Sequence, residues 1–306
     1  FSLVRHTGLR SMSDTIIRAA LIQHCNYGDA GSNLDYIADE IGAAAAQGAH
    51  LVLLQELHTH AYFCQTEDAE RFDLAEPIPG PTTSELSRLA RHHCLVVVGS
   101  VFERRATGLY HNTAVVLEAD GALAGRYRKM HIPQDPGYQE KFYFTPGDRG
   151  FHPIATSVGR LGVMICWDQW FPEAARLMAL AGADMLLYPT AIGWDMRDDA
   201  AERARQHEAW LTVQRGHAIA NGIPLVCCNR SGFEPAPRPD DPGIDFWGHS
   251  FACGPQGELL GRAGANPETL IVDIDCGRTE HVRRIWPFLR DRRIDAYQQL
   301  VERLLD

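Results

Sequence analysis

Three residues that could act together in nucleophilic catalysis follow separate apolar runs of the sequence. Glu56, Lys129 and Cys166 each fall at or just beyond the end of such a run. A cysteine can attack a carbonyl carbon, a carboxylate can relay the proton, and a lysine ammonium can stabilise the negative oxygen. Singly, each has an ordinary explanation, because a charged residue after a strand is usually a solvated surface group. Their chemistry is compatible with attack on a carbonyl group, but the strand-end positions alone do not decide between this role and the ordinary explanation.

Cys166 lies on a predicted turn between a strand and a helix. Strand-type residues precede it from Leu161 on, and Pro172 stands where the first turn of a helix would begin. Proline suits that position because its fixed φ fits the helix and its missing N–H is not needed there. A cysteine on such a turn can be exposed, with backbone N–H groups nearby to stabilise a thiolate or an oxyanion. Most free cysteines are instead buried packing residues, and the turn alone does not decide between the two.

The composition of the chain excludes several classes of protein. The chain has 306 residues, 45% of them apolar, which allows a large core in one or two domains. A formal net charge of −10 argues against a nucleic-acid partner and is compatible with a cationic substrate. The eight cysteines include no CxxC pair, so we expect no zinc ribbon or disulfide framework and a reducing cytoplasm as the compartment. No apolar run approaches the ~18 residues of a membrane span, so no membrane partner is expected.

Residues 1–11 show no hydrophobic period, and Met12 followed by Ser13 resembles a natural start. No positively charged segment precedes an apolar one there, so a signal peptide is not predicted. We predict that residues 1–11 are an added or disordered segment. Residues 12–306 are then expected to form a single domain with a C-terminal extension over 286–306.

Strand and helix patterns interleave along the chain without a linker, which predicts one α/β domain of stacked layers rather than two domains. The predicted strands cover 16–23, 51–54, 95–102, 113–117, 123–127, 161–165, 185–188, 224–228, 251–253, 259–262 and 270–274. The predicted helices are 33–46 capped by Asn33, 82–92 with a capping box of Thr82 and Glu85, one from Pro172, 201–221, and an amphipathic 294–305. The segments 134–150 and 231–245 are predicted loops. Layered α/β folds gather their sites at strand ends, where the three candidates lie.

The segments around the three candidates are more specific than their positions. LLQELH (53–58), GRYRKMHIP (125–133) and ICWDQWFPEAAR (165–176) together resemble the nitrilase superfamily of carbon–nitrogen hydrolases. The resemblance covers essentially all of 15–303 and preserves the order and spacing of the three motifs. It implies an α/β fold of the nitrilase type, a four-layer αββα sandwich.

The same resemblance implies roles for individual residues. Glu56 would be the general base and acid, Lys129 the oxyanion stabiliser and Cys166 the nucleophile. A second glutamate commonly supports this triad from the loop after the lysine, and Glu140 in YQEKFYFTPGD fits that place. No metal and no organic cofactor are implied.

Other segments narrow the resemblance within the superfamily. GYQEKFYFTPGD, LLYPTAIGW, QRGHAIANGIPLV and WPFLRDRRIDAY resemble the branch that removes the carbamoyl group from N-carbamoylputrescine in polyamine synthesis. Relatives that act on N-carbamoyl-D-amino acids place paired arginines shortly after the cysteine to grip a carboxylate. This sequence has Gln169 and Trp170 there, which argues against a carboxylate substrate of that type.

The implied substrate carries a distal ammonium group, which needs an acidic or aromatic partner. Asp195 is the candidate acid, and an Asp195 on the surface without such a role is equally compatible with the sequence. Trp194, Tyr62 and Tyr138 are candidate walls of the substrate site, and the backbone N–H of Trp167 is a candidate oxyanion donor.

The expected reaction is a two-step hydrolysis. Glu56 takes the proton of Cys166, and the thiolate attacks the carbamoyl carbon while Lys129 holds the oxyanion. Ammonia leaves and a thiocarbamate remains on Cys166. Water activated by Glu56 then releases an N-carboxy amine that loses carbon dioxide.

Alternatives from other classes remain open at this point. His-Thr-His at 58–60 resembles the HxH of metal-dependent amidohydrolases, which needs further ligands at later strand ends; His111, His131, His207 and His217 do not reproduce that pattern. A non-catalytic binding protein on the same fold is weakened by the presence of all three triad residue types. A β-ureidopropionase, an ω-amidase and a nitrilase share the triad. Superfamily members usually pair their subunits, so a homo-oligomer, a dimer or larger, is expected.

Overall fold

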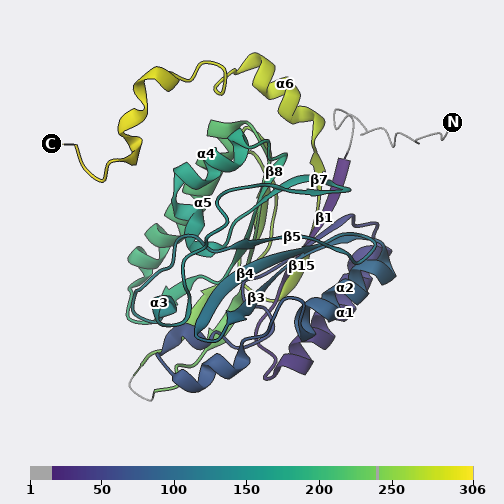
Figure 1. Cartoon of the computed structure of the whole chain (residues 1–306), viewed down its shortest axis with the longest axis vertical. Helices are drawn as coiled ribbons and strands as arrows, with labels where there is room; N and C mark the ends of the chain where they lie inside the picture. Colours follow the sequence, from purple (N-terminus) through teal and green to yellow (C-terminus); the bar gives the residue numbers. More distant parts are fainter. Residues whose placement is uncertain (1–15, 239–240, 306) are drawn as a thin grey trace.

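Two six-stranded sheets face each other in the middle of this computed structural model, and helices cover their outer faces (Figure 1). The structure describes residues 16–238 and 241–305. Helices α1 (Ala30–Ala46) and α2 (Pro81–His93) cover one sheet, and α4 (Pro172–Leu180) and α5 (Ala200–Asn221) cover the other. This is the predicted four-layer αββα arrangement. The predicted segment 1–11 and the start at Met12 lie outside the described residues.

The first sheet has the strand order β15-β1-β2-β3-β4-β5. Its strands are β1 (Ile16–Gln23), β2 (Leu51–Leu54), β3 (Val96–Ala106), β4 (Leu109–Leu117), β5 (Leu123–Arg128) and β15 (Glu268–Asp275). Strands β1, β2 and β3 are parallel, β4 is antiparallel to β3, and β5 is antiparallel to β4. Strands β2 and β5 therefore run in the same direction, and their carboxyl ends lie at the same edge of the sheet.

The second sheet has the strand order β14-β13-β10-β8-β7-β6. Its strands are β6 (Ile154–Thr156), β7 (Gly159–Val163), β8 (Met185–Thr190), β10 (Leu225–Asn229), β13 (Phe251–Cys253) and β14 (Leu259–Arg262). The central strands β7, β8 and β10 are parallel. Their carboxyl ends therefore also share one edge, the position where layered folds carry their sites.

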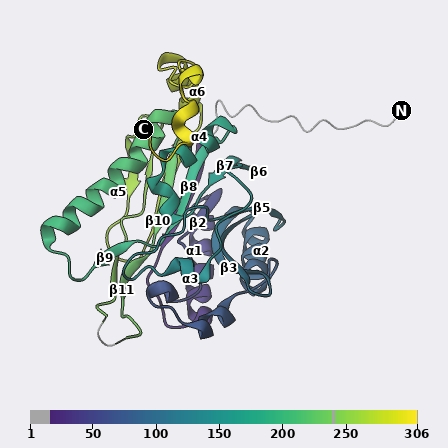
Figure 2. The same cartoon turned by 60° about the vertical axis from the view of Figure 1, so that its left-hand side comes forward.

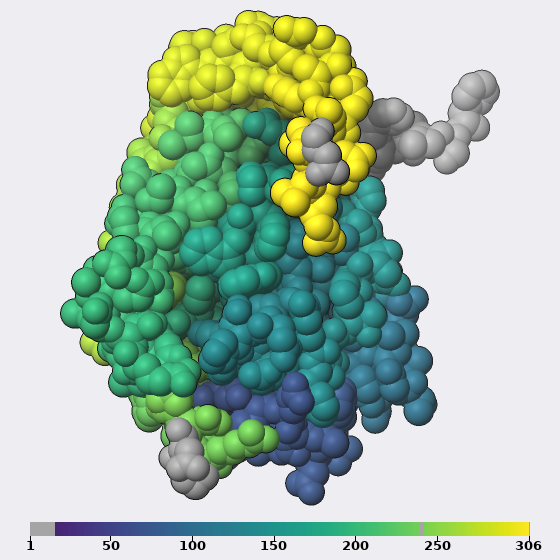
Figure 3. Space-filling view, turned by 90° about the vertical axis from the view of Figure 1, so that its left-hand side faces the viewer, coloured from purple at the N-terminus to yellow at the C-terminus, as the bar shows by residue number. Residues whose placement is uncertain are grey.

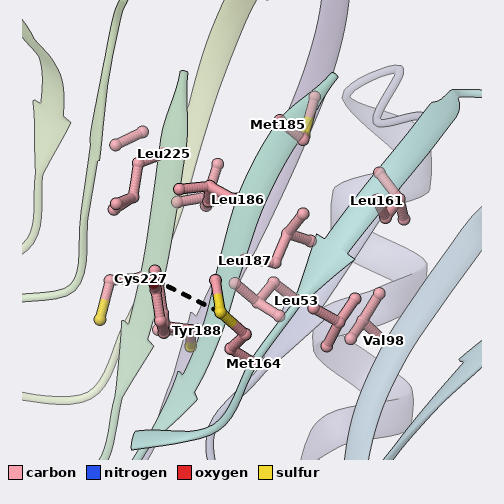
Figure 4. Close-up of a cluster of buried hydrophobic side chains, with 14 of the residues drawn as sticks. Leu53, Val98, Leu161, Met164, Met185, Leu186, Leu187, Tyr188, Leu225 and Cys227 are labelled. Carbon is pink, nitrogen blue, oxygen red and sulfur yellow. Dashed lines mark hydrogen bonds between the residues drawn. The ribbon is translucent and has the colours of Figure 1, made fainter. Parts of the chain in front are cut away.

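The two sheets are joined by a shared apolar core. Figure 4 shows Leu53 and Val98 of the first sheet against Leu161 and Leu187 of the second. Val52, like the other residues that alternate with the core-facing ones along the strands of the first sheet, faces the opposite way. These residues form a separate cluster under α1 and α2. Successive strand residues point to opposite faces, and both faces are covered here, which explains the continuous apolar run of β2.

Two helix starts differ from the prediction. Helix α1 begins at Ala30, and Asp29 is its N-cap, accepting from Ser32 N at 2.8 Å; the aspartate precedes the apolar period that pointed to Asn33. Helix α2 begins at Pro81, with Thr83 Oγ1 accepting from Gly80 N at 2.7 Å. The predicted capping box of Thr82 and Glu85 is therefore wrong by two residues, because the helix begins at the proline before them.

The predicted loops contain regular structure. Residues 231–245 contribute β11 (Ser231–Glu234) and β12 (Ile244–Trp247), which form a small sheet with β9 (Gly193–Asp195). Their Pro- and Asp-rich connection concealed the two short strands. The segment 134–150 contains the one-turn helix α3 (Glu140–Tyr143), and short 3-10 helices cover Phe63–Gln65 and Ala69–Leu74.

The C-terminal prediction is wrong in its secondary structure. Helix α6 (Gly277–Ile285) was not expected, and the predicted helix 294–305 is replaced by the 3-10 turns Ile294–Ala296 and Gln298–Val301. An amphipathic pattern gives a stable helix only where its apolar face is packed, and Val301 is 88% exposed. Figures 1 and 2 show α6 and the residues after it on the outside of the molecule, at the end opposite to α3, and Figure 3 shows this C-terminal segment, in yellow, on the surface. Within the described residues, no helix combines the length and apolarity that a membrane span requires.

Candidate active site

The three predicted catalytic residues lie beyond three strand ends, as the sequence indicated. Glu56 follows β2, Lys129 follows β5 of the same sheet, and Cys166 follows β7 of the facing sheet. Helix α3 adds Glu140. The side chains of Glu56, Lys129 and Glu140 are fully buried, and Cys166 is 4% exposed.

Lys129 joins the two glutamates. Its Nζ donates to Glu56 Oε1 at 2.7 Å and to Glu140 Oε2 at 2.6 Å. Asn112 Nδ2 donates to the same Glu56 Oε1 at 2.7 Å. The second oxygen, Glu56 Oε2, is buried and has no hydrogen-bond partner among the described residues. One carboxylate oxygen is thus held in place and the other is free to accept a proton.

Burial sets the protonation of the nucleophile. It raises the pKa of the Cys166 thiol well above its ordinary value, and the charge of Glu56 adds to this effect while Lys129 opposes it. A thiol in this environment rests protonated and needs a base before it can attack. Glu56 is the base that the geometry supplies.

The charge of Lys129 is maintained by its two partners. Burial opposes that charge, but Glu140 and Glu56 together hold the pKa of Lys129 well above its ordinary value. Burial raises the pKa of Glu140 to about 7, against the opposing influence of Lys129. Tyr62 Oη donates to Glu140 Oε1 at 2.6 Å. Tyr62, predicted as a wall of the substrate site, is therefore a buried partner of Glu140.

The backbone at Cys166 is left-handed, with φ of 42°, at the start of a 3-10 helix over Cys166–Trp170. Such a conformation costs of the order of 1 kcal/mol or more for a residue other than glycine. Asp168, which is fully buried, fixes this turn: its Oδ2 accepts from Ile165 N at 3.0 Å and Tyr127 Oη at 2.8 Å. Its Oδ1 accepts from His131 N at 2.9 Å. Asp168 thereby ties the cysteine turn to the end of β5.

A cavity of about 510 Å³ lies next to Tyr138, and none of Glu56, Lys129, Glu140 and Cys166 lines it. It is lined by Gln65, Thr66, Glu67, Gln134, Asp135, Pro136, Gly137, Tyr138, Gln139, Asp195, Arg197, Ala236, Arg238, Asp241, Pro242, Gly243 and Ile244. Tyr138, a predicted wall, lines it, accepts from Gly193 N at 2.9 Å and packs against Tyr62 with ring centroids 5.6 Å apart. Tyr138 thus lies between the cavity and the buried glutamate network.

Asp195 lines the cavity but already has a partner. Arg197 Nε donates to both of its oxygens, at 2.9 and 3.0 Å. This bond holds the pKa of Asp195 below its ordinary value. Trp194 does not line the cavity: its Nε1 donates to Arg203 O at 3.1 Å, and its ring packs against Trp247. Neighbouring residues of a strand face opposite ways, so the geometry that turns Asp195 to the cavity turns Trp194 away from it.

The remaining predicted residues lie around the cysteine turn. Trp167 is partly buried and packs edge-on against Trp170, with centroids 6.4 Å apart. Gln169 is fully buried and accepts from Thr190 Oγ1 at 3.2 Å, so it is a core residue rather than part of the cavity lining. Of the HxH segment, His58 is fully buried, and burial lowers its pKa to about 3. No group of three or more potential metal ligands occurs among residues 16–238 and 241–305.

Two functional positions were missed from the sequence. Asp168 lies within the cysteine motif, and an acid two residues after a nucleophile on a tight turn is a signal for a turn-fixing group. Asn112, inside β4, gave no such signal, because its role depends on its partner Glu56 from another strand.

A family model for carbon-nitrogen hydrolases matches residues 18–284, and the chain belongs to that family. Among curated relatives, it is 43% identical to N-carbamoylputrescine amidase of Solanum lycopersicum over 94% of this chain and 95% of that one. It is 38% identical to a citrullinase of Francisella tularensis subsp. tularensis over 94% of this chain and 99% of that one. The crystal structure of a carbon-nitrogen hydrolase from Helicobacter pylori G27 matches with a TM-score of 0.93 and 52% identity, over 95% and 100% of the two chains. The fold and class predicted from the motifs are confirmed.

Proposed function

We propose that this enzyme hydrolyses N-carbamoylputrescine to putrescine, carbon dioxide and ammonia. The observation that carries the proposal is the buried network in which Lys129 fixes one oxygen of Glu56 and leaves the other free, close to a protonated Cys166. The 43% identity to plant N-carbamoylputrescine amidases supports the choice of substrate.

The first half of the reaction forms a bond between Cys166 Sγ and the carbamoyl carbon. Glu56 takes the thiol proton, and the oxyanion is held by Lys129 and the backbone N–H of Trp167. The bond from carbon to the terminal nitrogen then breaks, and ammonia leaves with the proton from Glu56. A thiocarbamate remains on Cys166.

The second half returns the enzyme to its starting state. Glu56 takes a proton from water, the hydroxide attacks the thiocarbamate carbon, and the bond to Cys166 breaks. The proton on Glu56 returns to the thiolate. The released N-carboxy amine loses carbon dioxide and gives the diamine.

The cavity favours a cation at the distal end of the substrate. Carboxylates outnumber guanidinium groups in its lining, where Glu67, Asp135 and Asp241 join Asp195. An acidic lining raises the local concentration of a cationic ligand and contributes to its binding. All eight cysteines are free, which suits a cytoplasmic role in polyamine synthesis.

A second candidate substrate is a ureido amino acid of the citrulline type. It carries the same carbamoyl group and a distal ammonium, with an additional carboxylate. Arg197 and Arg238 line the same cavity and could take that carboxylate, and a citrullinase is among the relatives.

Ammonia release from four substrates tests the proposal: N-carbamoylputrescine, citrulline, N-carbamoyl-β-alanine and a simple ω-amide. We expect kcat/KM to be highest for N-carbamoylputrescine. A preference for citrulline would move the substrate to the second candidate. A preference for N-carbamoyl-β-alanine or the ω-amide would keep the triad and overturn the assignment of a cationic substrate.

A further inference from the structure

The segment that carries Glu56 leaves β2 without regular structure. Residues 56–62 connect β2 to the 3-10 helix Phe63–Gln65, and Leu57 has a left-handed backbone with φ of 48°. Buried carbonyl groups outside helices and strands need donors from elsewhere. The segment has one internal backbone bond, from His60 N to Leu57 O at 3.4 Å, so most of its polar groups need partners from other elements.

Asn33 and Ser100 each supply one such partner, to Thr59 O and Leu57 N, and Arg230 supplies three. Arg230 lies between β10 and β11, and its side chain is fully buried. Its Nη2 donates to three carbonyl oxygens of the segment, Leu57 O at 2.8 Å, His60 O at 3.1 Å and Glu56 O at 3.2 Å. One guanidinium group therefore satisfies the carbonyls on both sides of the left-handed residue.

Glu234 completes the contact. Its Oε1 accepts from Arg230 Nη1 at 2.7 Å, and its Oε2 accepts from Tyr62 N at 2.6 Å. The pair of Arg230 and Glu234 thus binds both ends of the segment. Tyr62 is also the residue whose hydroxyl donates to Glu140, so the same pair supports the second glutamate of the network.

This contact crosses between the two sheets. Arg230 follows β10, in the sheet that carries Cys166, whereas Glu56 follows β2 in the facing sheet. The backbone N–H groups of Glu56 and Arg230 donate to the same oxygen, Thr190 O, at 3.3 and 3.1 Å. The position of Glu56 relative to Cys166 is therefore set by polar contacts at the strand ends as well as by apolar packing between the sheets.

We propose that Arg230 and Glu234 are positioning residues that hold Glu56 in register with Cys166 across the sheet interface. The inference rests on the proposed role of Glu56 as the base. Arginine suits this task because its planar group has five fixed donors, whereas the three donors of a lysine ammonium radiate from one nitrogen.

Three histidines face this pair. The histidines around Arg230 are His24, His58 and His60, and burial lowers the pKa of each, to about 4 for His24 and about 3 for His58; the charge of Arg230 adds to the effect. They are neutral near pH 7. A change in the pH profile on substitution of Arg230 therefore reports on the catalytic network.

The test compares Arg230→Lys with Arg283→Lys. Arg283 also donates to a carbonyl, Asn221 O at 3.1 Å, but on α6 at the opposite end of the molecule from α3 (Figure 1). A displacement of about 1 Å in a catalytic group can lower the rate about 100-fold. We expect Arg230→Lys to lower kcat roughly 10- to 100-fold with KM nearly unchanged, and Arg283→Lys to leave kcat unchanged.

Two further readouts separate positioning from general stability. Arg230→Lys should slow the alkylation of Cys166 by iodoacetamide, because that rate depends on where Glu56 lies. It should also shift the acidic limb of the kcat/KM profile, because Tyr62, which Glu234 holds, donates to Glu140. A purely structural role would lower only the melting temperature. If Arg230→Lys does not fold, Glu234→Gln serves instead: one amide oxygen cannot accept from both Arg230 and Tyr62, so the same changes should appear at a smaller size.

Folded variants with unchanged kcat, alkylation rate and pH profile would overturn the proposal. This outcome is distinct from failure of the proposed function. If no ureido or amide substrate is hydrolysed by the unsubstituted enzyme, alkylation of Cys166 still reports whether Arg230 positions Glu56.

Discussion

Two groups of charged side chains in this molecule differ in burial. In the catalytic network, Glu56, Lys129 and Glu140 are fully buried, with bonds of 2.6 and 2.7 Å. At the cavity, Asp195 and Arg197 are joined by bonds of 2.9 and 3.0 Å, but their side chains are 28% and 64% exposed. A buried charge that loses its partner destabilises the fold by several kcal/mol, whereas an exposed pair contributes about 0–1 kcal/mol.

This difference in burial suggests different roles for the two groups, proton transfer for the buried network and substrate selection for the exposed pair. The buried network cannot rearrange without loss of stability, which suits groups that must stay in place for proton transfer. The exposed pair can open at little cost, so a substrate charge can replace either partner. We therefore expect changes in the buried network to affect kcat and changes at the cavity to affect the choice of substrate.

The largest effect is expected for Cys166→Ala. Loss of the nucleophile removes the only bond-forming group of the mechanism, and turnover should fall by about 10⁴-fold or more. Cys253→Ala, at a buried cysteine of β13, is the matched control and should retain kcat. Ammonia release by both variants, with circular dichroism as a check on folding, measures the difference; full activity of Cys166→Ala would refute the role of this residue.

Glu140→Gln should lower kcat about tenfold and change two pH dependences. In the folded protein the pKa of Glu140 is raised from 4.5 to about 7, so the folded state keeps this proton where the unfolded chain has released it. The contribution to stability is full below about pH 4.5 and is lost as the pH rises through 7. The wild-type kcat should fall below about pH 7, as the carboxylate beside Lys129 is neutralised.

The Glu140→Gln variant should show neither the loss of stability between pH 4.5 and 7 nor the fall of kcat below about pH 7. Thermal unfolding between pH 4.5 and 8, together with a profile of kcat, tests this. A variant that keeps the wild-type acidic limb and the same slope of stability with pH would show that another group titrates in this range.

At the cavity, opposite substitutions should have opposite effects. Arg197→Ala releases Asp195 for a substrate ammonium, and kcat/KM for N-carbamoylputrescine should rise relative to citrulline by about two- to fivefold, because one exposed charge contact is worth about 0–1 kcal/mol. Asp195→Asn should lower the ratio of kcat/KM for N-carbamoylputrescine to kcat/KM for citrulline. Ratios of kcat/KM for the two substrates give the result; ratios that both variants leave unchanged would mean that this pair does not contact the substrate.

The smallest effect on chemistry is expected at the C-terminal segment. Truncation after Ile285 removes a series of exposed apolar side chains: Trp286, Phe288, Ile294, Tyr297, Leu300, Val301, Leu304 and Leu305. Exposed apolar surface of this kind favours contact with a second copy of the chain. Light scattering should show a dimer or larger for the full chain and a smaller species after truncation, with kcat per site retained. A monomeric full chain would refute the proposed homo-oligomer.

The strand-end positions of Glu56 and Cys166 could be predicted from the sequence because their signals are local. The apolar run before Glu56 has the same bounds as β2, and the residues around Cys166 predicted the turn. Roles that depend on distant partners were not predictable. Arg230 gave no signal, because its acceptors lie about 170 residues earlier in the chain. The strands within 231–245 were missed because β12 pairs with β9, far from it in sequence.

The covalent intermediate tests the central claim most directly. The enzyme would be mixed with N-carbamoylputrescine, quenched in acid within one turnover, and digested for mass spectrometry. The account predicts a peptide containing Cys166 that carries the mass of the substrate less ammonia. Turnover with no adduct on Cys166, or an adduct on another residue, would contradict it.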